Sequence, residues 1–241
     1  MKAMILAAGE GRRMRPLTDM VPKPMLPVGG RPLVERLISL LRNHGVHEIA
    51  INLHHQPQVL ATHIGDGRRL GVRVVYSREE LVLGTAGGVK RMEAFFDDEP
   101  FYVLYGDVFT DLHLSALRSF HVERKAALTM ALYQPETLRE CGVAKLGQDD
   151  RILHFVEKPE PGSEPSRWAN AGVYIIEPSV LRHIPPNRPF DFGADLFPRL
   201  LARGVPLFGY ASDALVLDIG TPRGYLRAQA AAAEASAARA A

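Results

Sequence analysis

The chain has 241 residues, of which 29 are basic and 27 acidic, so that its formal net charge is only +2. This length suits one large α/β domain that buries most of its apolar surface. The small net charge argues against a surface that coats nucleic acid. With Cys141 as the single cysteine, one chain has no disulfide framework and no multi-cysteine metal site.

The start of the chain lacks the pattern of a signal peptide, because its short apolar run leads directly into a glycine turn. No stretch approaches the about 18 consecutive apolar residues of a membrane span. We therefore expect a cytoplasmic protein with neither a membrane nor a nucleic acid as partner.

The first predicted element is a buried strand at residues 3–8, which ends in Gly9 and Gly11. A basic cluster follows at residues 12–15. A strand that breaks into a glycine-rich turn exposes backbone N–H groups, which cradle a phosphate. Nearby guanidinium groups add charge and bidentate hydrogen bonds. Taken alone, the pattern also fits an ordinary turn with solvated arginines.

Lys23 stands between Pro22 and Pro24. Each proline ring fixes its own φ angle and favours an extended conformation in the residue before it, so the lysine has little backbone freedom. Together with the glycine turn, this constrained lysine favours a nucleotide site.

The next segments alternate between strand and helix patterns. A strand, helix, strand, helix, strand order is typical of a parallel sheet with helices on both faces, and such sheets bind ligands at the carboxyl ends of their strands. Adjacent residues of an extended segment point to opposite faces, so His54 and His55 are expected to pack rather than to chelate one ion. The predicted elements here are a helix at 33–43, a strand at 48–53, a helix at 58–64 and a strand at 71–76.

Residues 83–88, with the sequence LGTAGG, precede a predicted helix at 89–96. Small residues before a helix allow a flat ring to approach the backbone and to be read by its N–H and C=O groups. A plain helix-entry loop explains the same residues equally well.

Two aspartates occupy similar settings, although they are far apart in the chain. Asp107 follows the predicted strand 101–105 and a glycine, and Asp218 follows the apolar run 214–217. A carboxylate at the carboxyl end of a strand suits Mg²⁺, which prefers oxygen ligands. The alternative for Asp107 is a turn-capping role, which Asp111 could fill instead.

The second half of the chain continues the sheet. The predicted elements are a strand at 126–133, a hairpin of 142–146 with 152–155, a strand at 172–176, a helix at 196–201, and a last hairpin that begins at 207–210. Residues 228–241 are almost all alanine, which favours a helix with a frayed end.

Residues 3–27 resemble the signature of the sugar-1-phosphate nucleotidyltransferases, LAAGxGxRLRPLT followed by PKPMLP. The chain departs from this signature at Arg12, where many members have threonine, and at Met14, where leucine is common. The resemblance covers residues 1–227. The matching positions are Gly9, Gly11, Arg13, Pro16, Lys23 and Pro24.

The resemblance also assigns roles to residues. The implied catalytic residues are Arg13, Lys23 and Asp107. The implied nucleotide-binding residues are Ala8, Gly9, Gly11, Arg13, Lys23, Gly84, Thr85 and Gly87. The FVEKP and NAG motifs, with the glycine of the GD motif, imply sugar-phosphate binding by Gly106, Glu157, Lys158, Asn170 and Gly172. The GD and DxGTP motifs imply that Asp107 and Asp218 bind the metal.

The fold implied by the resemblance is α/β, with a Rossmann-like, mostly parallel mixed sheet flanked by helices. It implies one catalytic domain at 1–227, an alanine-rich tail at 228–241 and no C-terminal β-helix. The partners would be an NTP and a sugar 1-phosphate, and the chain would be a monomer or a homodimer.

The implied activity is the Mg²⁺-dependent transfer of a nucleotidyl group from the NTP to the sugar 1-phosphate. LGTAGG is most like the form in GDP-mannose pyrophosphorylases, which favours GTP with mannose 1-phosphate. UTP or dTTP with another sugar 1-phosphate, such as N-acetylmuramate 1-phosphate, is an alternative. A metal-dependent glycosyltransferase and a non-catalytic nucleotide-sugar-binding subunit are rivals from other classes.

Overall fold

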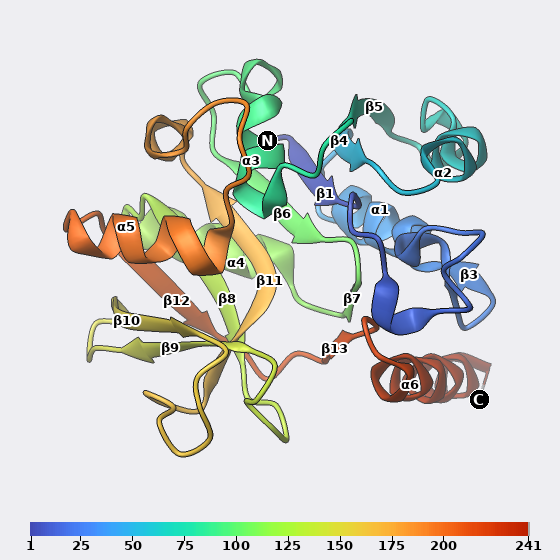
Figure 1. The fold of residues 1–241 in the computed structure, drawn as a ribbon. Coiled ribbons are helices and arrows are strands. Elements are labelled where there is room, and N and C mark those ends of the chain that lie inside the picture. Colours follow the sequence, from blue (N-terminus) through green and yellow to red (C-terminus); the bar gives the residue numbers. More distant parts are fainter. Residues whose placement is uncertain (241) are drawn as a thin grey trace.

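The computed structural model describes the backbone of residues 1–240 and the side chains of residues 1–237. Within this part of the chain a nine-stranded mixed sheet forms the centre, and helices cover both of its faces (Figure 1). The predicted α/β architecture with a mixed sheet is therefore confirmed. The sheet is not mostly parallel as expected, since parallel and antiparallel pairings are equally represented, because β11 alone pairs antiparallel with three strands.

The N-terminal half supplies four parallel strands, whose carboxyl ends meet at one edge. Strand β1 lies between β4 and β6, so the turn that follows β1 is at the middle of this edge. The order across this half is β5 (Arg73–Arg78), β4 (Glu48–Leu53), β1 (Ala3–Leu6) and β6 (Phe101–Tyr105).

The C-terminal half is built around β11 (Trp168–Ile176), which pairs antiparallel with β6, β8 and β9. The predicted hairpin is confirmed as an antiparallel pair. The remaining strands of this half are β8 (Leu128–Tyr133), β9 (Gly142–Leu146), β10 (Ile152–Glu157) and β12 (Leu207–Ala211).

The predicted last hairpin is wrong. Strand β12 pairs in parallel with β8 instead. Strand β13 (Val216–Asp218) pairs antiparallel with β7 (Val108–Thr110), outside the main sheet. A local pattern of two apolar runs cannot distinguish a hairpin from two strands with distant partners, and here the distant partners prevail. The pairing of β13 with β7 brings Asp218 near Asp107.

Two groups of helices cover the sheet, one on each face. On one face are α1 (Leu33–Asn43), α2 (Pro57–Ile64), α4 (Leu114–Arg124) and α6 (Pro222–Ala240). On the other are α3 (Gly84–Arg91), a π-helix (Phe192–Leu196) and α5 (Phe197–Ala202). The 3-10 helices are η1 (Arg12–Met14), η2 (Lys23–Met25), η3 (Arg68–Leu70), η4 (Glu93–Phe95) and η5 (Pro178–His183).

Helix α1 has its predicted bounds because its apolar residues recur every three or four positions and are buried on one side. Helix α3 differs, since it begins at Gly84 and includes most of the segment predicted as a loop. The Glu79 carboxylate accepts a hydrogen bond from Leu83 N at 2.9 Å, which supports this earlier start. The strand predicted at 71–76 begins at Arg73, because Gly71 forms a turn with φ +75°.

Helix α6 starts at Pro222, before the alanine-rich tail, and continues along the tail to Ala240. Ala228 and Ala232 are buried in the same core as α1, because their small side chains allow the helix to lie close to its neighbours. Ala241 lies outside the described residues. No helix of the described chain is both long enough and apolar enough to cross a membrane.

Candidate active site

The turn after β1 forms the floor of the site. Gly11 has φ +65°, a conformation that favours glycine, and a Cβ there would lie 2.9 Å from Thr18 Cγ2. The chain then enters η1, which carries Arg13. A small cavity of about 40 Å³ adjoins this turn and is lined by Leu6, Ala7, Gly9, Lys23, Pro24 and Asp107.

Lys23 lies at this cavity, as the paired prolines led us to expect. Its Nζ is 2.5 Å from Asp107 Oδ2, and both side chains are largely buried. Asp107 follows β6 through Gly106, whose N–H donates to the carbonyl of Leu6 at 2.9 Å. A Cβ on Gly106 would come within 2.5 Å of that carbonyl oxygen, so only glycine lets β6 pass this close to β1.

Asp218 reaches the same place from the other end of the chain. In the β7–β13 ladder it lies opposite Val108, and Ile219 N donates to the backbone oxygen of Asp107 at 2.9 Å. Desolvation by the surrounding chain, and then the charge of Asp107, raise the pKa of the Asp218 carboxyl above its usual range. The structure thus brings together two carboxylates that are 111 positions apart (218 − 107), as the sequence predicts.

Arg13 lies over the turn that follows Asp218. A Cβ on Gly220 would be 3.1 Å from Arg13 Nη2, and Arg13 Nη1 is 3.5 Å from Glu140 Oε2. Arg13 and Asp218 both line a cavity of about 390 Å³, which extends between β13, the start of α6 and the segment that follows β8. A cation thus borders the aspartate pair on the solvent side.

The segment assigned to the base is the first turn of α3, packed against residues 188–192. Gly87 N donates to the carbonyl of Phe190 at 2.9 Å, and a Cβ on Gly84 would lie 2.7 Å from that oxygen. Thr85 Oγ1 donates to Asp191 Oδ2 at 2.7 Å. Close packing therefore explains why glycine stands at positions 84 and 87. Base recognition by this segment stays a prediction.

Glu157 is at the end of β10 and directs its carboxylate towards two glycines, although the residue as a whole is exposed. A Cβ on Gly142 would be 2.7 Å from its Oε2, and a Cβ on Gly193 in the π-helix would be 2.9 Å from its Cδ. Desolvation, and then the charge of Asp191, raise the pKa of the Glu157 carboxyl. Lys158 has φ +48° and an exposed side chain, and its backbone N–H donates to the carbonyl of Cys141 at 3.1 Å.

Asn170 and Gly172 lie in an irregularity of β11, where the register with β8 shifts. The Asn170 carboxamide donates to Tyr174 Oη at 2.7 Å and accepts from Gly172 N at 2.9 Å. Gly172 has φ +68°, and a Cβ there would lie 3.0 Å from Cγ of Tyr105. Since Tyr105 is two residues before Asp107, these residues lie near the aspartate pair.

A buried polar link was not predicted from the sequence. Asn52 Oδ1 accepts from Ala7 N at 2.7 Å, and Asn52 Nδ2 donates to Glu79 Oε1 at 2.8 Å. This link joins the turn that follows β1 to the segment just before α3. The available signal was Asn52, which interrupts the apolar run 49–53, although this signal does not indicate its partner.

The two adjacent histidines pack, as expected. His54 Nδ1 is 2.8 Å from the carbonyl of Glu79, and His55 Nε2 is 2.7 Å from that of Thr18. Both hold loops at the carboxyl edge of the sheet.

Among the described residues no group of three or more His, Cys, Asp or Glu side chains could hold a metal by itself. Two carboxylates beside the glycine turn that follows β1 nevertheless fit Mg²⁺, which proteins commonly bind through one or two carboxylates while substrate phosphates and waters complete the shell. The donor chemistry of Asp107 and Asp218 therefore suits this ion.

A family model described as nucleotidyl transferase matches residues 2–235. The chain belongs to this family. A UTP–glucose-1-phosphate uridylyltransferase of Synechocystis is 39% identical over 95% of the chain. A mannose-1-phosphate guanylyltransferase of Mycobacterium tuberculosis is 34% identical over 95% of the chain. The chain spans 62% and 63% of the lengths of these relatives, respectively.

Solved structures share the fold of this chain over nearly its whole length. A putative glucose-1-phosphate thymidylyltransferase from Bacillus anthracis superposes with a TM-score of 0.88 at 25% identity, covering 96% of this chain and 95% of that one. A UDP-glucose pyrophosphorylase in complex with UDP-glucose gives a TM-score of 0.83 at 22% identity, covering 97% and 98%, and shows likeness of fold alone.

Proposed function

We propose that the chain transfers a nucleotidyl group from an NTP to a sugar 1-phosphate, and so forms an NDP-sugar and pyrophosphate. The observation that carries this proposal is the convergence of Asp107 and Asp218 beside Lys23 and Arg13. The relatives are named as enzymes that act on glucose 1-phosphate or mannose 1-phosphate, which supports the same class of reaction.

The reaction joins two polyanions, and the residues suit that task. A phosphate oxygen of the sugar 1-phosphate attacks the α-phosphorus in line, a new P–O bond forms, and the bond to pyrophosphate breaks. The nucleophile is already ionised, so no general base is needed. Catalysis therefore depends on positioning the two substrates and on offsetting the negative charge of their phosphates.

Lys23 and Arg13 would hold the triphosphate, and Lys158 would hold the phosphate of the sugar. Lys23 is restrained by its prolines and by Asp107, so it presents its charge at a fixed place. The exposed side chain of Lys158 can swing towards a bound phosphate, because the chain fixes only its backbone.

We propose that Asp107 and Asp218 hold Mg²⁺. When bound, the ion would supply positive charge that offsets the phosphate charges of both substrates. Desolvation and then the charge of Asp107 raise the pKa of Asp218, and a nearby cation would favour the ionised form of the Asp218 carboxyl.

GTP with mannose 1-phosphate is our first choice of substrates, because residues 83–88 have the LGTAGG sequence and several relatives are named mannose-1-phosphate guanylyltransferases. UTP with glucose 1-phosphate is the second candidate. It is favoured by the relative from Synechocystis, which is 39% identical and is named as a uridylyltransferase.

The two rival classes have less support. A glycosyltransferase would use a DxD-type metal motif, whereas Asp107 is followed by Val108 and Phe109. A non-catalytic binding subunit has no need for all of Arg13, Lys23, Asp107 and Asp218, and the chain has all four. We further propose that the enzyme acts in the cytoplasm, as a monomer or a homodimer.

The test is pyrophosphate release from ATP, CTP, GTP, UTP and dTTP, each paired with several sugar 1-phosphates, with and without Mg²⁺. We expect Mg²⁺-dependent release with GTP and mannose 1-phosphate. Release only with UTP and glucose 1-phosphate would retain the reaction class but overturn our first choice. No release from any pair would contradict the proposed function.

A further inference from the structure

Helix α6 packs against two segments of the site: the turn that follows Asp218, and a small hairpin that follows Lys23 in the chain. It begins four residues after Asp218 and runs beside β2 (Pro27–Val28), which forms a small hairpin with β3 (Arg31–Pro32). The hairpin follows Lys23 closely in sequence. One rigid helix thus touches the segments on both sides of the proposed reaction centre.

Two side chains of α6 hold the hairpin by its backbone. Gln229 Oε1 accepts from Gly29 N at 2.8 Å, and Gln229 Nε2 donates to the carbonyl of Pro27 at 2.9 Å. Tyr225 Oη donates to the same carbonyl at 2.7 Å. Gln229 Nε2 is also 3.0 Å from Tyr225 Oη, so the two side chains support each other.

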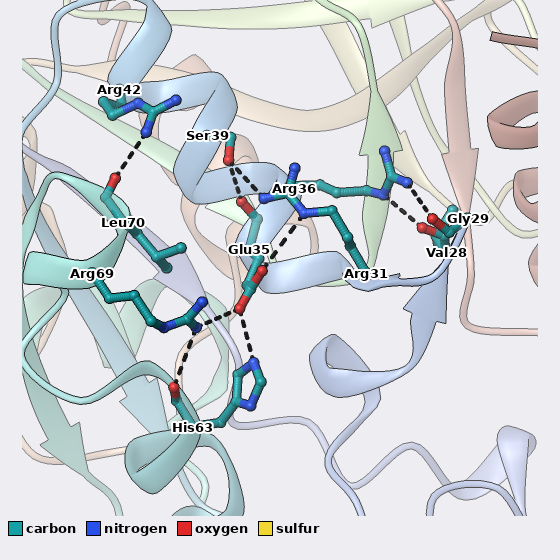
Figure 2. Close-up of polar contacts among 10 residues, drawn as sticks. All are labelled: Val28, Gly29, Arg31, Glu35, Arg36, Ser39, Arg42, His63, Arg69 and Leu70. Carbon is teal, nitrogen blue, oxygen red and sulfur yellow. Dashed lines mark hydrogen bonds and ion pairs between the residues drawn. The ribbon is translucent and has the colours of Figure 1, made fainter. Parts of the chain in front are cut away.

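Helix α1 holds the same hairpin from the other side, as Figure 2 shows. Arg36 Nε donates to the carbonyl of Val28 at 2.6 Å and Arg36 Nη2 to that of Gly29 at 3.0 Å. A Cβ on Gly29 would lie 2.8 Å from the Cβ of Ala232 and 2.6 Å from Arg36 Nη2. The hairpin is therefore enclosed between α1 and α6, with no space for a side chain at Gly29.

The hairpin is joined to Lys23 without a flexible link. Met25 N donates to the carbonyl of Pro22 at 2.8 Å, and Leu26 N donates to that of Lys23 at 3.0 Å. Leu26 is itself buried, and its carbonyl accepts from Leu33 N at the start of α1. A shift of the hairpin would therefore move the backbone of Lys23.

We propose that Gln229 and Tyr225 are positioning residues for Lys23. By fixing the hairpin backbone, they hold the lysine ammonium at the place where it meets the triphosphate. Both side chains bind the hairpin and not the lysine itself, so their effect passes through the hairpin backbone. This inference rests on the proposed transfer reaction, because it gives Lys23 its role there.

The test compares Gln229→Met and Tyr225→Phe with the parent chain, each also in a Lys23→Met background. Gln229→Met keeps the length of the side chain, and Tyr225→Phe removes a single hydroxyl. The matched control is Tyr76→Phe, because Tyr76 Oη donates to the carbonyl of Gly65 at 2.7 Å, away from the site. The measurements are kcat, KM for the sugar 1-phosphate, the Kd of GTP and the melting temperature.

We expect each α6 variant to lower kcat by roughly tenfold, since a small misplacement of a charged group is costly. KM for the sugar 1-phosphate should change by less than about twofold, because Lys158 and not Lys23 is assigned to that substrate. In the Lys23→Met background the same changes should have almost no further effect, because residues that act as one unit are non-additive. The control should behave like the parent chain.

Equal losses of kcat with and without Lys23 would overturn the inference, and so would an unchanged kcat in the folded single variants. If the parent chain releases no pyrophosphate from any substrate pair, the proposed function fails, and the Kd of GTP then decides the inference separately. A Kd that rises in the α6 variants only while Lys23 is present would support the positioning role. A Kd that does not change would contradict it.

Discussion

Single residues at the site show a conflict between stability and function, and Glu157 is the clearest example. Its carboxyl is partly desolvated and close to the charge of Asp191, and both factors raise its pKa. A carboxyl whose pKa is raised by folding stabilises the protein below its unfolded pKa, and this stabilisation is lost as the pH rises through the folded pKa. At neutral pH the charged Glu157 therefore lowers the free energy of unfolding.

We expect Glu157→Gln to raise the melting temperature at pH 7 and to lower kcat/KM for the sugar 1-phosphate. The gain in stability should shrink as the pH falls through the raised pKa of the folded state, and it should vanish below the ordinary pKa near 4.5, where Glu157 is uncharged in both states. Thermal unfolding at several pH values, with an activity assay beside it, measures both effects. A variant that is less stable than the parent at pH 7 would contradict this account of the charge.

Some site residues could be recognised from the sequence and others could not. Asp107 and Asp218 were recognisable because each follows an apolar run and precedes a turn. The link between Asn52 and Glu79 was missed, because it depends on which strands are neighbours. Asn52 interrupts an apolar run, but neither Asn52 nor Glu79 has a local pattern that indicates its partner.

At the scale of elements, α1 is held to α2 and η3 by a buried carboxylate (Figure 2). Glu35 Oε1 is 2.5 Å from Arg69 Nη2 and 2.9 Å from His63 Nε2, and the Glu35 side chain is only 8% exposed. Burial by itself would raise its pKa, but the hydrogen bonds from Arg69 and then His63 outweigh burial, so the pKa of Glu35 is lowered. The ionised carboxylate is therefore the form that joins these elements.

We expect Glu35→Gln to lower the free energy of unfolding at pH 7 by about 2 kcal/mol, the size of a hydrogen bond to a charged group. Because folding lowers this pKa, the stabilisation is present above the ordinary value near 4.5 and is lost as the pH falls through the folded pKa. The difference between parent and variant should therefore close in acid. Urea unfolding at a series of pH values provides the measurement.

Glu48→Gln is the matched control, since Glu48 forms an exposed pair with Arg73 at 3.1 Å. Exposed pairs contribute little, so we expect less than about 0.5 kcal/mol. If both substitutions lowered the free energy of unfolding equally, burial would not make the Glu35 contacts more stabilising than an exposed pair.

Periodicity predicted the elements well where one face of an element is buried, as in α1. Periodicity gave the wrong result where tertiary contacts decide where an element starts or which strand it pairs with. Helix α3 starts at Gly84 because Glu79 binds Leu83 N and because Gly84 and Gly87 allow close packing against Phe190. Strand β12 pairs with β8 rather than with β13, and no local signal marks that choice.

At the scale of the whole molecule, the fold assembles one charged site from both ends of the chain. The parallel strands bring the glycine turn after β1, Lys23 and Asp107 to one edge, and the β7–β13 pairing adds Asp218. The overall sheet was predictable, because alternating strand and helix patterns leave few arrangements. The sequence indicated that Asp107 and Asp218 act together. It did not indicate how they are placed, because their geometry depends on the long-range pairing of β7 with β13.

The most direct test of this account is the Mg²⁺ dependence of pyrophosphate release by the parent chain, Asp107→Asn and Asp218→Asn. We predict that the parent chain turns over only with Mg²⁺. Each variant should keep its fold and lose at least roughly a hundredfold in kcat, the scale of one lost electrostatic contact in the transition state. Near-normal, Mg²⁺-dependent turnover by either folded variant would contradict the claim that the two aspartates serve one reaction.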